Sequence, residues 1–513
     1  MAHIVQTAAG RVQGTDFEGV LAFRTIPYAA PTGGANRFLP PQPLPRWSDV
    51  LDCTEFRGKA PQAGIAPPPR PELAEFSGKP DPSPETEDCL TLNVWTPSVD
   101  AAHRPVMVWF HGGAFSWGNA NAPRVWGHRL AHKHDVVVVT VNQRLNIFGH
   151  LDLSAIGGEA YRHSGNAGTL DMVAALEWIR DNIVRFGGDP GNVTIFGESG
   201  GGAKVCVLLT MPRAVGLFHR GIVQSGAVVR LRTPERAQAL TSHVMRQLGA
   251  RSVVDLQAVP VSDLLAAIKP AEAALGTSPY PLFDRYAFGP VVDGDIVPAH
   301  PFDPAASSIQ PDVPIIIGDM KQETASYLAP VDAVWNRTLT REQMLERLAP
   351  ITGDQTGRVV ELYDRLFPGL NPSEELIAIT SDSNFRIRSW VVAQRRAALE
   401  RGKVWMYSFE WETPVFDGRL GAPHAMDVPF TFNTLDLTNA TGGAHEAEAL
   451  SETMAALWCE FARIGRPEHP SVPTWPAYDV MERATLVLDR DCRIERDPRA
   501  EARLLWQEIT GAA

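Results

Sequence analysis

The sequence predicts an α/β fold in which a central, mostly parallel and twisted β-sheet carries helices on both faces. Two observations lead to this prediction. Short segments rich in Val, Ile and other apolar residues alternate along the chain with longer segments of helical character. Such alternation is typical of parallel sheets covered by crossover helices. The composition, 44% hydrophobic and 21% charged over 513 residues, is that of a globular protein with ample material for a buried core.

The expected elements follow in chain order. Residues 10–31 contain apolar stretches closed by glycines, which predict β-hairpins. Helices are expected at residues 124–134 and 168–188. The segments expected to be strands are residues 90–97, 104–113, 135–144, 192–199, 220–227, 313–319 and 403–411.

Residues 60–87 have a different character. This segment is rich in Pro, Gly and Ser and shows no apolar periodicity, so it predicts a long loop. A loop of this length in a compact protein is either a functional lid or disordered.

The stretch VTIFGESGGGAKV, residues 193–205, joins an apolar strand to a glycine-rich turn with one serine in it. Gly197, Ser199 and Gly201 fit the pattern G-x-S-x-G, in which the chain bends sharply after a strand and holds the serine hydroxyl at the tip of the turn. The N–H groups that follow lie at the positive end of the next helix. This geometry suits attack by Ser199 on a carbonyl carbon. The alternative is a turn whose serine only caps the helix, and the motif alone does not separate the two.

A second glycine-rich turn follows the strand expected upstream. It reads His111, Gly112, Gly113, Ala114, and its small residues let backbone N–H groups approach a ligand. The turn matches the HGGG-type segment that binds the oxyanion in esterases. A lone HGG turn is weak support, but its position upstream of a G-x-S-x-G motif makes the pair specific.

With these motifs the chain resembles the type-B carboxylesterases, a family of the α/β-hydrolase fold that includes bacterial p-nitrobenzyl esterases and the cholinesterases. The resemblance runs from about Gly10 to about Leu488, and it is carried by EDCLTLNVWTP from Glu87 and by the whole of residues 165–202. It implies one α/β-hydrolase domain over residues 1–513, with the 60–87 loop near the active-site entrance. It also implies a carboxylic-ester hydrolase that needs no cofactor.

The family uses a Ser–Glu–His triad in that chain order, and the resemblance assigns the three positions residue by residue. In the family, a glycine ends a buried strand and the acid lies five residues after that glycine. Here the glycine is Gly318 and the acid is Glu323. The histidine lies in an H-x-x-[ED]-x-P-[FY] stretch, which here is residues 421–433 with His424. His424 would take the proton of Ser199 during attack, and Glu323 would hold the imidazole and stabilise its charged form.

The resemblance also implies the groups around the triad. Ser225 resembles a family serine that hydrogen-bonds near the triad. Glu198, directly before the nucleophile, is expected among the residues that support the triad. Phe115 and Trp117 are expected to line the substrate pocket, although packing in the core is the rival interpretation. The oxyanion donors are expected to be the backbone N–H groups of Gly113, Ala114 and Gly200.

Several residues depart from the family pattern, and others form ion pairs that the family pattern includes. Ala114 stands where many relatives have Gly, and Gly200 where most have Ala. Gln143 and Asn146 replace a common Tyr and a common Gly, and the sequence offers no reason for either. The ion pairs expected to be structural are Arg37 with Glu87 and Arg144 with Asp171.

Composition limits the partners. The net charge of −12 argues against nucleic acid or an anionic membrane surface. Five scattered cysteines, with no apparent signal peptide or membrane span, predict reduced thiols and a cytoplasmic protein. His128 and His132 are one helical turn apart, but a solvated helix face is favoured over a metal site. We expect a small ester and water as substrates and either a monomer or a small homo-oligomer.

Three functions fit these observations to different degrees. The leading one is hydrolysis of carboxylic esters through an acyl-enzyme intermediate. The second is cleavage of carbamates or activated amides by the same triad, since the leaving group is selected by a pocket that the sequence does not define. The third is a non-catalytic binding protein on an esterase fold, which the three intact triad positions argue against.

Overall fold

The computed structural model describes residues 3–63, 70, 72–275 and 288–511. Part of the predicted 60–87 loop therefore lies outside the described residues. The strands are β1 (His3–Gln6), β2 (Arg11–Phe17), β3 (Val20–Pro27), β4 (Val50–Asp52), β5 (Thr91–Thr96), β6 (Arg104–Phe110), β7 (Val137–Val141), β8 (Gly188–Glu198), β9 (Arg220–Gln224), β10 (Ile315–Met320), β11 (Val404–Phe409), β12 (Ala484–Leu488) and β13 (Arg493–Arg496).

These described strands form one sheet in the order β1-β2-β3-β5-β7-β6-β8-β9-β10-β11-β12-β13, with β4 beside β2. From β7 to β12 every neighbouring pair is parallel, whereas the pairs β1–β2, β2–β3, β3–β5, β5–β7 and β12–β13 are antiparallel. The prediction of a mostly parallel sheet is confirmed. Strands β6 and β7 are buried at every residue, because helices cover both faces of a parallel sheet and leave its strands no solvated side.

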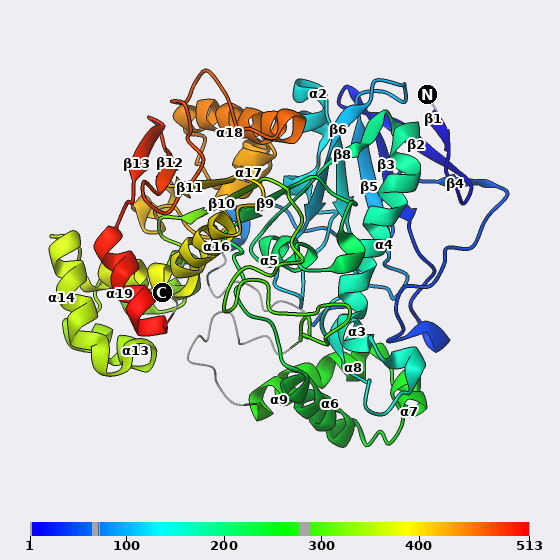
Figure 1. Cartoon of the computed structure of the whole chain (residues 1–513), viewed down its shortest axis with the longest axis horizontal. Helices are drawn as coiled ribbons and strands as arrows, with labels where there is room; N and C mark the ends of the chain where they lie inside the picture. Colours follow the sequence, from blue (N-terminus) through cyan, green and yellow to red (C-terminus); the bar gives the residue numbers. More distant parts are fainter. Residues whose placement is uncertain (1–2, 64–69, 71, 276–287, 512–513) are drawn as a thin grey trace.

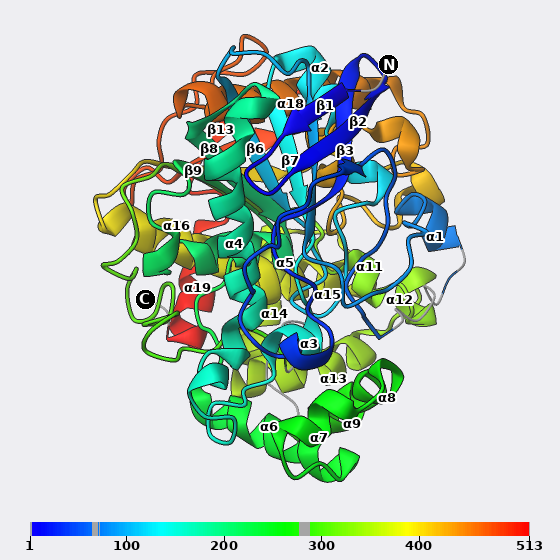
Figure 2. The same cartoon turned by 90° about the vertical axis from the view of Figure 1, so that its right-hand side faces the viewer.

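The helices cover the sheet as Figures 1 and 2 show. Helices α2 and α18 contact each other and pack on the strands around β6, while α4 and α5 contact each other and pack on β8. Helices α6 to α9 form a separate group at the lower edge of both views. The helices are α1 (Glu72–Phe76), α2 (His128–His134), α3 (Asn146–His150), α4 (Ala167–Asn182), α5 (Gly200–Leu208), α6 (Pro234–Leu248), α7 (Val253–Ala258), α8 (Val261–Ala266), α9 (Ile268–Ala274), α11 (Ala325–Leu328), α12 (Asp332–Trp335), α13 (Arg341–Thr352), α14 (Thr356–Leu366), α15 (Pro372–Ser381), α16 (Ile387–Ala398), α17 (Asp427–Thr431), α18 (His445–Ile464) and α19 (Ala500–Thr510).

The two helices predicted from the sequence exist but are shorter. Helix α2 begins only at His128, because a 3₁₀ turn and Gly127 precede it. Helix α4 ends at Asn182, and a 3₁₀ turn continues to Phe186. The 60–87 segment, expected to be a loop throughout, contains the short helix α1. Among the described helices, none combines the length and the apolar character that a membrane crossing requires.

Among the described residues, the larger of two apolar clusters draws on residues from Val5 to Trp506. A single domain over residues 1–513 stays a prediction. Both predicted ion pairs are present. Arg37 Nη2 lies 2.6 Å from Glu87 Oε2. The fully buried pair between Arg144 and Asp171 has the same separation.

The prediction of a solvated helix face at the two histidines of α2 is wrong for His128. The residue is 1% exposed, and its ring meets the ring of Phe17 edge-on at 5.2 Å. The reason is that the β2–β3 hairpin folds over the start of α2, and Glu18 Oε2 lies 3.1 Å from Nε2 of His128. His132 is exposed as expected. The described residues contain no group of three His, Cys, Asp or Glu side chains placed to hold a metal ion.

Candidate active site

Ser199 occupies the sharp bend between β8 and α5. Its φ of 55° and ψ of −121° lie in a region that residues with a Cβ rarely adopt. Glycines make the bend possible, because a Cβ at Gly201 would come within 2.0 Å of the Phe110 carbonyl oxygen. The N–H of Ser199 donates to the carbonyl of Gln224 at 2.8 Å, which ties the bend to the end of β9. The serine side chain is only half-buried, so it is open to a ligand.

The predicted acid and histidine meet. Glu323 follows β10, is fully buried, and accepts a hydrogen bond from the N–H of Met320 through Oε1 at 2.9 Å. Its Oε2 lies 2.5 Å from Nδ1 of His424. The two loops are joined by their backbones as well, since the N–H of Gln322 donates to the carbonyl of Ala422 at 3.0 Å. These contacts hold the imidazole by its Nδ1 side and leave Nε2 for another partner.

Nε2 of His424 lies 3.0 Å from Oε1 of Glu198, the residue directly before Ser199. This is an ion-pair distance, but Nε2 has no well-directed hydrogen bond to any of the described residues. The rings of Phe385 and Tyr327 pack on the imidazole with centroids 4.8 and 5.4 Å away. The structure thus places Glu198 beside the histidine and adds two aromatic neighbours that the sequence analysis missed.

Three buried carboxyl groups set the electrostatics of the histidine. Burial alone lowers the pKa of His424, but the carboxylates of Glu198 and Glu323 outweigh this and raise it to about 9. Burial raises the pKa of Glu198 to about 7. Burial also raises the pKa of Asp427 to about 6, although hydrogen bonds from Gln224 and the hydroxyl of Tyr407 lower it. The site therefore favours the charged imidazolium and can hold a proton between its histidine and carboxyl groups.

The turn after β6 comes to lie against the start of α5. Gly113 and Ala114 have φ values of 86° and 53°, and the carbonyl of Gly113 accepts from the N–H groups of Ser116 and Trp117. A Cβ at Gly200 would lie 2.3 Å from both the nitrogen and the oxygen of Ala114. The three predicted oxyanion donors are therefore brought together at the bend that carries Ser199.

The structure explains two residues for which the sequence offered no reason. Gln143 donates through Nε2 to Nε2 of His111 at 2.9 Å. This ring is neutral, because burial and the nearby Lys204 lower its pKa far below the usual value. Asn146 has a φ of 46° and donates through Nδ2 to the carbonyls of Pro61 and Ser116. Asn tolerates this conformation better than most residues. Here it joins the 60–87 segment to residues 111–117, the turn after β6 that carries two of the predicted oxyanion donors and is called the oxyanion turn below.

Ser225 and the two aromatic residues fall in different surroundings. Ser225 follows β9 with a φ of 49°, and its N–H donates to the carbonyl of Gly318. Its hydroxyl is buried and has no hydrogen-bond partner among the described residues. Phe115 is 7% exposed and packs on His150, which fits the core interpretation. Trp117 is half-buried, so a place in the pocket wall suits it better; both pocket assignments stay predictions.

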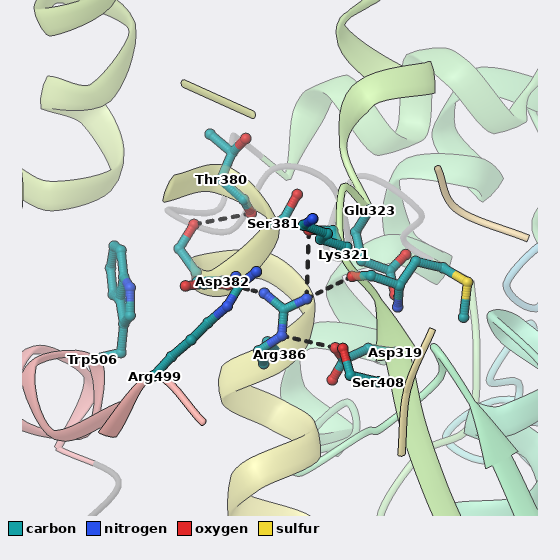
Figure 3. A network of polar contacts seen from close by, with 12 residues as sticks. Asp319, Lys321, Glu323, Thr380, Ser381, Asp382, Arg386, Ser408, Arg499 and Trp506 are labelled. Atoms are coloured by element: carbon teal, nitrogen blue, oxygen red, sulfur yellow. Dashed lines mark hydrogen bonds and ion pairs between the residues drawn. The ribbon is translucent and has the colours of Figure 1, made fainter. Parts of the chain in front are cut away.

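A buried network behind the acid, missed by the sequence analysis, is drawn in Figure 3. Arg386 lies at its centre, in the π-helix η8 (Asp382–Arg386) that joins α15 to α16. Its Nε donates to Asp319 at 2.8 Å and its Nη2 to the Met320 carbonyl at 2.6 Å, while Nη1 donates to Asp382. Because Met320 also donates its N–H to Glu323, the guanidinium fixes the strand end that orients the acid.

The network continues to the C-terminal helix. Asp382 accepts from Arg499 at 3.0 Å and from the hydroxyl of Tyr363 at 2.5 Å. Trp506 of α19 in turn donates to the Tyr363 hydroxyl at 2.9 Å. The same π-helix that supplies Arg386 also presents Phe385 to the imidazole, and π-helical turns occur often at functional sites.

The fold and this arrangement define an α/β-hydrolase with an esterase-like site, and the comparisons identify the family. The model of one protein family, described as "Carboxylesterase family", matches residues 1–506 of this chain. The chain therefore belongs to the carboxylesterase family and is a carboxylic-ester hydrolase. The resemblance inferred from the motifs is confirmed.

Three relatives illustrate the similarity. The para-nitrobenzyl esterase of Bacillus subtilis is 37% identical, with 98% of each chain covered. The phenmedipham hydrolase of Pseudarthrobacter oxydans is 33% identical, with 96% of this chain and 97% of that one covered. A solved carboxylesterase structure from Geobacillus stearothermophilus is 36% identical and superposes with a TM-score of 0.83, covering 98% of this chain and 100% of that one.

Proposed function

We propose that Ser199, His424 and Glu323 form the catalytic triad of this esterase. The observation that carries the proposal is the 2.5 Å contact between His424 Nδ1 and Glu323 Oε2. Nε2 of the same ring lies against Glu198, the residue directly before Ser199, and Ser199 itself sits in a strained bend. In its neutral form, His424 takes the proton of Ser199 through Nε2 as the serine oxygen attacks the ester carbonyl. The carboxylate of Glu323 holds the imidazole by Nδ1 and stabilises the imidazolium.

The tetrahedral intermediate carries a negative oxygen, for which we propose the N–H groups of Gly113, Ala114 and Gly200 as donors. The close approach of the oxyanion turn to α5 supports this assignment. Loss of one such donor typically slows the reaction about 10²- to 10³-fold. His424 then gives its proton to the leaving alcohol, and water releases the acid by the same route. Ser225, with its unpartnered hydroxyl beside the acid strand, is proposed to support the triad.

Glu198 has a separate proposed part. Its carboxyl group lies against Nε2 of His424 and favours the imidazolium, which forms when the serine loses its proton. The same interaction holds the resting histidine charged at low pH, when it cannot act as a base. Glu198 thereby sets the pH range in which the triad is competent.

The test is hydrolysis of p-nitrophenyl butyrate by the wild type and by Ser199→Ala, without added metal or cofactor. The variant should retain about 10⁻³ of the wild-type rate or less. Equal rates in the two proteins would refute the nucleophile assignment. Labelling with a fluorophosphonate, expected for the wild type and not for the variant, checks the same serine independently of substrate choice.

Carbamates or activated amides are the second candidate substrates. Relatives of similar identity carry different substrate names, para-nitrobenzyl esterase and phenmedipham hydrolase, so membership of the family leaves the preferred substrate open. An aryl carbamate assayed beside the ester ranks the two substrate classes by their kcat/KM values. Ser199→Ala should abolish both activities together, because they would share one nucleophile.

The 60–87 segment is proposed to border the entrance to the site. Gln62 exchanges two hydrogen bonds with the backbone of Gly118, just beyond the oxyanion turn. Arg70 donates to the carbonyl of Ala329, in the segment that follows Glu323. A cytoplasmic location is also proposed; all five cysteines are free, as expected for a reducing compartment.

A further inference from the structure

Lys204 is a buried cationic side chain that the proposed mechanism does not use. It lies in α5, five residues after Ser199, and is 0% exposed. Its Nζ donates to the carbonyl of His111 at 2.7 Å and to the carbonyl of Ala114 at 3.0 Å. Both acceptors belong to the oxyanion turn, and the ring of Phe115 in the same turn lies 5.5 Å from the nitrogen. A buried lysine is rare without such partners.

The two acceptors bracket two of the three proposed oxyanion donors. The N–H groups of Gly113 and Ala114 lie between the carbonyls of His111 and Ala114 along the chain. Ala114 has a φ of 53°, a left-handed conformation that glycine adopts freely and a residue with a Cβ disfavours. The turn therefore contains a residue that does not keep this conformation by itself, and Lys204 holds the carbonyl on its far side.

Gly200 and Lys204 act on Ala114 from one face of α5. They are four residues apart in a helix and so share a face. Gly200 allows the backbone of Ala114 to approach so closely that a Cβ would be 2.3 Å from its nitrogen. Lys204 reaches the oxygen of the same residue. The combination of Gly200, Lys204 and Ala114 is thus one interlocked contact between helix and turn.

We propose that Lys204 is a positioning residue that holds Ala114 in its left-handed conformation and thereby aims the oxyanion donors at the substrate. The inference rests on the proposed function, because it presumes that these N–H groups bind the oxyanion. It does not depend on the charge of Lys204. Burial lowers the pKa of Lys204 to about 7, although the nearby Glu198 raises it. If the amine is neutral, it still has two N–H groups, one for each carbonyl.

The experiment is a double-mutant cycle on Lys204→Met, Ala114→Gly and the double variant, assayed with p-nitrophenyl butyrate. Lys204→Met should lower kcat roughly 10- to 100-fold, since small misplacements of catalytic groups have effects of this size, with little change in KM. The double variant should recover most of the loss, because glycine needs no clamp to adopt a positive φ. A trifluoromethyl ketone, which Ser199 converts to a tetrahedral alkoxide, should lose affinity in parallel with kcat.

Two controls separate the possible failures. Lys269→Met changes an exposed lysine of α9 and should leave kcat unchanged. If Ser199→Ala keeps full activity, the proposed function fails whatever Lys204 does. If Ser199→Ala is inactive, a normal kcat in Lys204→Met overturns this inference alone. So does a double variant as impaired as Lys204→Met, since the loss of kcat would then not come from the conformation of Ala114.

Folding is followed in each variant by far-UV circular dichroism and thermal melting. Should Lys204→Met fail to fold, the cycle is repeated with Lys204→Gln, whose amide retains an NH₂ donor. A smaller loss of kcat that Ala114→Gly restores supports the proposal. A loss that it does not restore overturns it.

Discussion

The turn after β6 and the loop after β10 lie on opposite sides of β8 in the sheet, and they are held in place differently. The oxyanion turn is held mainly by close backbone packing against α5, to which Lys204 adds hydrogen bonds from its side chain. The acid loop is held by a network of buried charges centred on Arg386 (Figure 3).

The difference follows from what each side must position. Oxyanion donors are main-chain groups, so close packing of glycines against a helix places them directly. The acid is a side chain at the end of a strand, and burying it requires further polar groups to satisfy the strand end. We therefore expect the oxyanion turn to be disturbed most by substitutions that add atoms at its contact with α5. We expect the loop that carries Glu323 to be disturbed most by substitutions that remove a charged partner.

Glu323→Gln should have the largest effect of the changes on either side. An amide cannot hold the imidazole in the same tautomer or stabilise its charge as a carboxylate does, so kcat should fall about 10³- to 10⁴-fold. The measurement is kcat for p-nitrophenyl butyrate, with thermal melting to show that the fold persists. A loss smaller than about tenfold would place the catalytic acid elsewhere.

Gly200→Ala breaks the oxyanion side by steric change alone. The new Cβ meets the backbone of Ala114 at 2.3 Å, so the turn must move, and kcat should fall roughly 10²-fold. Gly357→Ala is the matched control, because a Cβ there meets nothing within 4 Å. Adding Ala114→Gly to Gly200→Ala should recover part of kcat. Unchanged kcat in the single variant would contradict the interlocked contact.

Arg386→Met breaks the acid side by loss of charge pairing. It leaves Asp319 buried without its arginine, while Asp382 keeps Arg499. Removing one member of a buried pair costs about 3–5 kcal/mol of unfolding free energy. The turnover of the folded fraction should fall less than in Glu323→Gln, since Met320 can still donate to the acid. Chemical denaturation and kcat at low temperature separate the two effects. The free energy of unfolding of Arg386→Lys should lie between those of the wild type and Arg386→Met. Equal stability of Arg386→Met and the wild type would refute the role of Arg386 in holding the acid loop.

Glu198→Gln should change the pH dependence more than the maximum rate. The carboxylate raises the pKa of His424, and its removal must lower that pKa. Because only the neutral imidazole accepts the serine proton, kcat/KM rises with pH through this pKa. The acid limb of the profile should therefore move to lower pH by about one unit. A limb that stays in place or moves upward would show that Glu198 does not act on the histidine.

Much of the fold could be predicted because it depends on local patterns. Strand β6 at residues 104–110 and the part of β8 at residues 193–198 are buried and mostly apolar, which is the local pattern that predicts a buried strand. The glycines around Ser199 mark the bend directly. The positions of Glu323 and His424 came from the family resemblance. They are 101 positions apart, and no local pattern joins them.

The sequence by itself determined the fold class and the bend that carries Ser199, because short-range apolar periodicity and glycine spacing are sufficient for these. The resemblance of its motifs to known esterases indicated the family. Only the tertiary structure decided that Lys204, Arg386 and His128 are buried. A lysine, an arginine or a histidine on a helix looks the same in sequence whether it faces water or a buried partner. For Arg386 that partner is Asp319, 67 positions away, and its burial is tolerated only because the fold brings the opposite charges together.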